Sequence, residues 1–67
     1  MVNDSDVSRA ATLLIRRHGN SAPTHAAGRI RELFAAGDLP GWAIWGAILR
    51  AVRLLLAEER TNDTSLH

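Results

Sequence analysis

The chain contains no cysteine and no lysine, and one phenylalanine and two tryptophans are its only large aromatic residues. The absence of cysteine excludes disulfide bonds and the usual cysteine-ligated zinc and iron–sulfur sites. With 67 residues the chain forms one domain, and a domain of this size buries only about 60% of its unfolded surface. Domains this small rarely gain more than about 3–5 kcal/mol from their core alone. Stability must therefore come from close helix packing or from self-association.

The sequence predicts neither a secretory signal nor a membrane span. Residues 1–10 are polar and acidic, whereas a signal begins with basic and then apolar residues. Residues 39–56 are almost all apolar, but Arg50 and Arg53 interrupt them, and an arginine near the centre of a spanning helix costs about 2.5 kcal/mol or more. Because the lack of cysteine also fits a reducing compartment, we expect a cytoplasmic protein that does not associate with membranes.

Apolar residues recur at the spacing of helix faces, and no segment alternates as a strand would. The sequence predicts an all-α fold, a three-helix bundle whose third helix is the longest. The helices are expected at about 6–18, 22–36 and 39–60, as a single domain between a flexible start (1–5) and a flexible tail (61–67).

Residues that favour helix ends mark these boundaries. Ser5 is expected to cap the first helix, and Gly19 to end it. Ser21 is expected to cap the second helix, with Pro23 in its first turn, and Asp38 to cap the third. The faces expected to be buried carry Val7, Ala10 or Ala11, Leu14 and His18 in the first helix, and Ala27, Ile30, Leu33 and Phe34 in the second. In the third helix the large apolar face carries Trp45, Ile48, Leu49, Val52, Leu55 and Leu56, and Trp45 is assigned to the core.

The third predicted helix is apolar around most of its circumference, which is typical of a helix covered on most sides. Its alanines at positions 43, 47 and 51 form a ladder on which a second copy could pack closely. Two alternatives remain open: alanines that simply favour helix and face water, and a surface that binds a different protein. The predicted interface residues are Trp42, Ala43, Ala47, Ala51 and Leu54.

Arginines gather in the first half of the chain, where no acidic residue lies between Arg9 and Arg31. Guanidinium groups suit phosphate and carboxylate oxygens, so a possible anion or nucleic-acid patch consists of Arg16, Arg17, Arg29 and Arg31. A helix-turn-helix register fits poorly, because Ile15 stands where a small residue is expected. The simpler alternative is a solvated face with ion pairs to neighbouring acids.

No group of residues predicts catalysis. His18 and His25 lie seven positions apart, with no third residue at metal-ligand spacing. Ser21 is better explained as a helix cap than as a nucleophile, and Glu58 and Glu59 point about 100° apart on a helix. We therefore expect no enzyme activity, no metal and no cofactor.

Residues 17–55 resemble a family of short bacterial proteins, mostly alphaproteobacterial, that is classed as a domain of unknown function. The matching residues are His18, Gly19, Ala22, Pro23, Arg29, Ile30, Leu33, Gly37, Asp38, Gly41, Trp45 and Ile48. The chain departs from the family pattern at Gly28, where an acidic residue is usual. The resemblance implies a small helical cytoplasmic protein without a known activity.

These observations predict a small non-enzymatic interaction or adaptor module that forms a homodimer through its third helix. The alternative is a nucleic-acid-associated regulator that uses the arginine patch.

Overall fold

The computed structural model describes the backbone of residues 3–65 and the side chains of residues 3–59. Its elements are α1 (Asp4–His18), the short 3-10 helix η1 (Gly19–Ser21), α2 (Ala22–Ala35) and α3 (Leu39–Ser65). No strand occurs among the described residues. The prediction of an all-α protein is confirmed.

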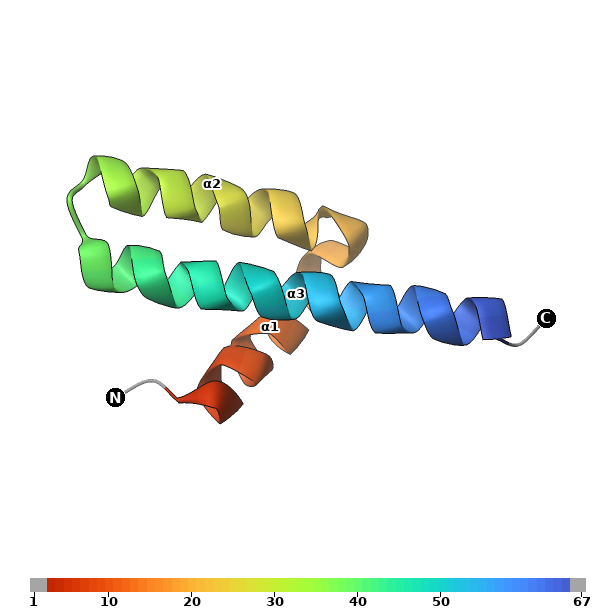
Figure 1. Cartoon of the computed structure of the whole chain (residues 1–67). Coiled ribbons are helices and arrows are strands. Elements are labelled where there is room, and N and C mark those ends of the chain that lie inside the picture. Colours follow the sequence, from red (N-terminus) through yellow and green to blue (C-terminus); the bar gives the residue numbers. More distant parts are fainter. Residues whose placement is uncertain (1–2, 66–67) are drawn as a thin grey trace.

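The helices do not form a three-helix bundle, so that part of the prediction is wrong. α2 and α3 run antiparallel and side by side as a helical hairpin, and α1 crosses α3 steeply near the middle (Figure 1). A bundle needs an apolar stripe along the whole length of every helix. On α1 only Ala11 and Leu14 are buried, so this helix packs at a crossing point rather than along its length.

The start of the first helix differs from the prediction, while its end agrees. Asn3, not Ser5, is the cap: its side-chain Oδ1 accepts a 3.0 Å hydrogen bond from the backbone N–H of Asp6. The helix consequently begins at Asp4 rather than at residue 6. Gly19 follows the last helical residue with φ 57° and ψ −130°, a conformation that side chains disfavour.

Ser21 precedes α2 as predicted, but its side chain makes no capping hydrogen bond. The chain is already helical in η1, where the backbone N–H of Ala22 bonds to the carbonyl of Gly19. The predicted cap role of Ser21 is therefore wrong. Backbone hydrogen bonds from η1 take the place of the side chain.

The cap of the third helix is confirmed. The backbone N–H of Gly41 donates a 3.0 Å hydrogen bond to Oδ1 of Asp38, and Gly37 (φ 77°) provides the turn that reverses the chain. α3 ends at Ser65, later than the predicted end near residue 60. The backbone is thus helical at residues 61–65, which were expected in the tail, and at residues 4–5, which were expected in the start. Residues 1–2 and 66–67 of these two segments lie outside the described residues.

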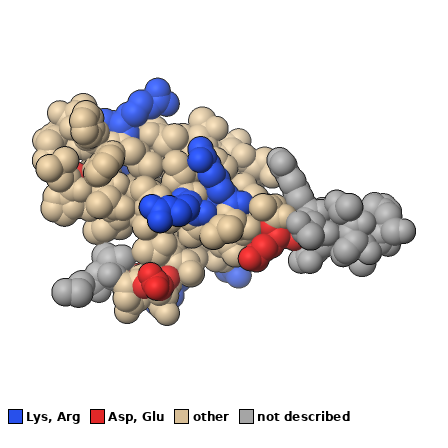
Figure 2. Space-filling view, in the orientation of Figure 1, with Lys and Arg blue, Asp and Glu red and all other residues tan. Residues whose placement is uncertain are grey.

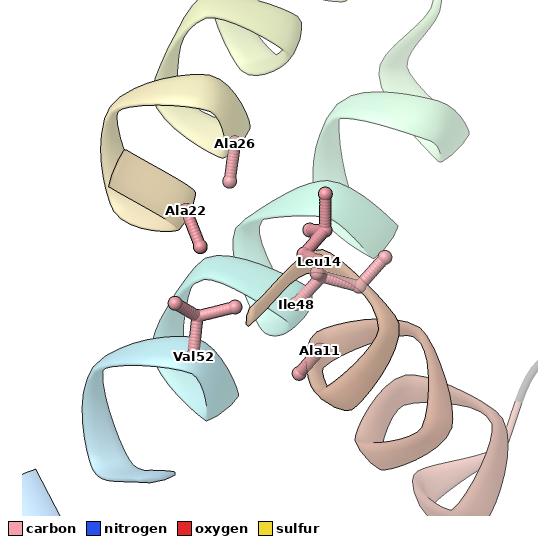
Figure 3. Packing of buried hydrophobic residues seen from close by; sticks show 6 residues of the cluster. All are labelled: Ala11, Leu14, Ala22, Ala26, Ile48 and Val52. Carbon is pink, nitrogen blue, oxygen red and sulfur yellow. The ribbon is translucent and has the colours of Figure 1, made fainter. Parts of the chain in front are cut away.

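The core is small and rich in alanine. Two buried residues from each helix converge where the three helices meet: Ala11, Leu14, Ala22, Ala26, Ile48 and Val52 (Figure 3). Alanines at this point let the helix backbones approach closely. The largest fully buried side chain is that of Val52, so the core removes little apolar surface from water.

The molecule is extended for its size. Its radius of gyration is 12.9 Å, whereas a compact domain of this length has about 11 Å. Its accessible surface is 5129 Å², whereas a compact monomer of 7.3 kDa exposes about 4,200 Å². The excess surface follows from the elongated shape, with principal extents of 47 × 23 × 16 Å.

Candidate functional site

α1 and α2 cover two flanks of α3 and leave a face between them open to solvent. On one flank Trp42 meets Phe34 of α2, with ring centroids 6.1 Å apart. On the other flank Leu55 shares a groove with Thr12 and Ile15 of α1. The residues of α3 that point away from both flanks form what we call the outer face: Leu39, Ala43, Ala47, Arg50, Leu54 and Ala57.

The outer face exposes large apolar side chains. Leu39 is 58% exposed and Leu54 is 62% exposed, although both belong to the longest helix of the protein. Basic side chains lie over the middle of α3 on the side turned to the viewer, with acidic atoms beside them toward the C-terminal end (Figure 2). Apolar exposure of this kind marks an association surface when it is contiguous.

Length and hydropathy also qualify this helix as a candidate membrane span. The segment Leu39–Glu59 has a mean hydropathy of 1.4, and only 11% of the apolar window is buried inside the molecule. This share reflects the small core of the described structure, to which α3 contributes Ile48 and Val52. Other apolar residues of α3, such as Trp45 and Leu49, pack against the core while partly exposed.

The structure divides the five predicted interface residues among three places. Ala43 and Leu54 lie exposed on the outer face, and Ala47 lies half-buried at its edge. Ala51 packs against the core and does not face outward. Trp42 lies about 140° around the helix from Ala47, against Phe34. The five residues therefore do not form one continuous surface.

Two exposed apolar residues near the hairpin turn were not predicted as surface residues. Phe34 was expected in the core but is 63% exposed, and Leu39 opens α3 on the outer face. Phe34 occupies the last turn of α2, beyond the crossing point at which α1 covers the hairpin (Figure 1). Its position at the end of α2, just before the turn at residues 36–37, was the signal of this in the sequence.

The four arginines of the predicted patch are all exposed. Nη1 of Arg29 lies 3.3 Å from Oε1 of Glu32 in an exposed ion pair. Arg31 lies two positions further along, about 160° around α2 from Arg29. Arg16 and Arg17 are exposed in the last turn of α1. Arg29 and Arg31 thus lie on different sides of α2.

The first turn brings His18 and His25 together, which the sequence did not predict. Their rings stack with centroids 4.1 Å apart and an interplanar angle of 20°. Ring nitrogens bind a metal through lone pairs in the ring plane, and nearly parallel planes do not converge on one ion. Among the described residues no group of three or more potential metal ligands occurs.

A shallow groove of about 260 Å³ lies between α1 and the second half of α3. Ile15 and Leu55 contribute apolar surface, Arg16 lies on one wall, and Glu58 and Glu59 lie on the other. This volume is below the roughly 300 Å³ at which ordinary ligand clefts begin. The groove is therefore a crevice between crossing helices, with rim side chains that are exposed to water.

No protein-family model matches the chain, and no curated protein or solved structure has significant similarity to it. The resemblance of residues 17–55 to a bacterial family stays a prediction.

Proposed function

We propose that the protein is a small, non-enzymatic helical interaction module that associates with a second copy of itself through the outer face of α3. The observation that carries the proposal is the exposure of large apolar side chains on this face, where Leu39 is 58% exposed and Leu54 is 62% exposed. A second copy is a partner that is present wherever the protein is made.

The small core supports the same proposal. Among the described residues six are buried, half of them alanines, so the isolated chain removes little apolar surface from water. Burial of about 800 Å² per subunit at about 25 cal/mol per Å² of its apolar part contributes several kcal/mol. Dimer formation would therefore supply stabilisation that the monomer core lacks.

Membrane insertion is the second use that the apolar helix allows. Arg50 and Arg53 are both exposed and lie among the residues that lipid would surround. Each would cost about 2.5–3.5 kcal/mol near the centre of a bilayer. In a dimer, by contrast, both guanidinium groups reach water beyond their aliphatic stems. We therefore propose a cytoplasmic dimer rather than a membrane helix.

A nucleic-acid-binding role receives less support. Phosphate recognition depends on several cations that face the same backbone, whereas Arg29 is paired with Glu32 and Arg31 lies on another side of α2. The shallow groove likewise gives no support to a catalytic role.

The experiment is a comparison of molar mass by analytical ultracentrifugation. Ala43 is exposed on the outer face, so Ala43→Glu leaves the monomer core intact and places a carboxylate in the proposed interface. Thr24→Glu is the matched control, since Thr24 is exposed on α2 away from the outer face. We expect the wild type and Thr24→Glu to be dimers, and Ala43→Glu to be a monomer with unchanged helix content.

Two results would overturn the proposal. One is an Ala43→Glu variant that dimerises as strongly as the wild type. The other is a wild type that stays monomeric in water but floats with lipid vesicles, which would establish membrane association instead.

A further inference from the structure

We draw no further inference here: the strongest candidate, the exposed apolar patch that Phe34 and Trp42 form at the hairpin end of α2 and α3, carries none, because nothing in the structure shows what covers it.

Discussion

Val52 provides the sharpest test of how the monomer is held together. It is fully buried at the point where the three helices meet, and it is the largest side chain buried to this extent (Figure 3). Val52→Ala shortens a buried side chain by two carbons, and the burial of each contributes about 0.8 kcal/mol to the free energy of unfolding. The cavity that is left adds to the loss. We expect the free energy of unfolding to fall by about 2 kcal/mol.

A loss of this size is large for this protein. A core of so few residues supplies about 3–5 kcal/mol, so Val52→Ala should remove about half of it. The assay is urea unfolding followed by far-ultraviolet circular dichroism, at two protein concentrations that differ about tenfold. Because the lost contact lies within one chain, the loss should be the same at both concentrations.

Leu54→Ala is the matched control for that assay. Leu54 lies on the same helix but is 62% exposed, so its truncation should change stability only through the dimer, and the change should depend on protein concentration. The reasoning would be refuted if Val52→Ala lost less than about 0.5 kcal/mol, because the three helices would then not meet at Val52 in solution.

Three further predictions concern the turns and the hairpin end. Asp38→Ala removes the cap that accepts from Gly41 and should cost about 1 kcal/mol in urea unfolding, whereas Asp38→Asn should cost much less; equal losses would argue against the cap. Gly19→Ala should lower the thermal midpoint through a strain of about 1–3 kcal/mol at φ 57°, and an unchanged midpoint would show that the turn is different. Phe34→Ala should cost less than about 1.5 kcal/mol, the scale of its contact with Trp42, whereas a buried phenylalanine would cost about 3–5 kcal/mol.

Local structure was largely predictable from the sequence. The positions of Gly19 and Asp38 as helix boundaries followed from the chemistry of helix ends. Ile48 and Val52 followed from the spacing of apolar residues on the third helix. These predictions depend only on residues within one or two turns of each other, which is why they succeeded.

The packing of the helices was not predictable in the same way. Periodicity gives the angle of a residue around its own helix but not the angle at which two helices cross. α1 crosses α3 instead of lying along it (Figure 1), so Phe34 near the far end of the hairpin stays exposed. For the same reason the sequence did not predict that Ala51 packs against the core while Ala43 faces outward.

The arginines on α2 show a second limit of sequence reasoning. Arg29 and Arg31 are near neighbours in the sequence, but a helix turns them to different sides. The acid that pairs with Arg29 is Glu32, one turn further along the same helix. Proximity in sequence was a poor guide to a shared surface.

The most direct test of the central claim is the absolute mass of the wild-type protein in solution, by light scattering after gel filtration, from about 5 to 500 µM. Self-association through α3 predicts a mass that reaches twice the 7.3 kDa of the chain within this range. A mass of one chain at every concentration would contradict it.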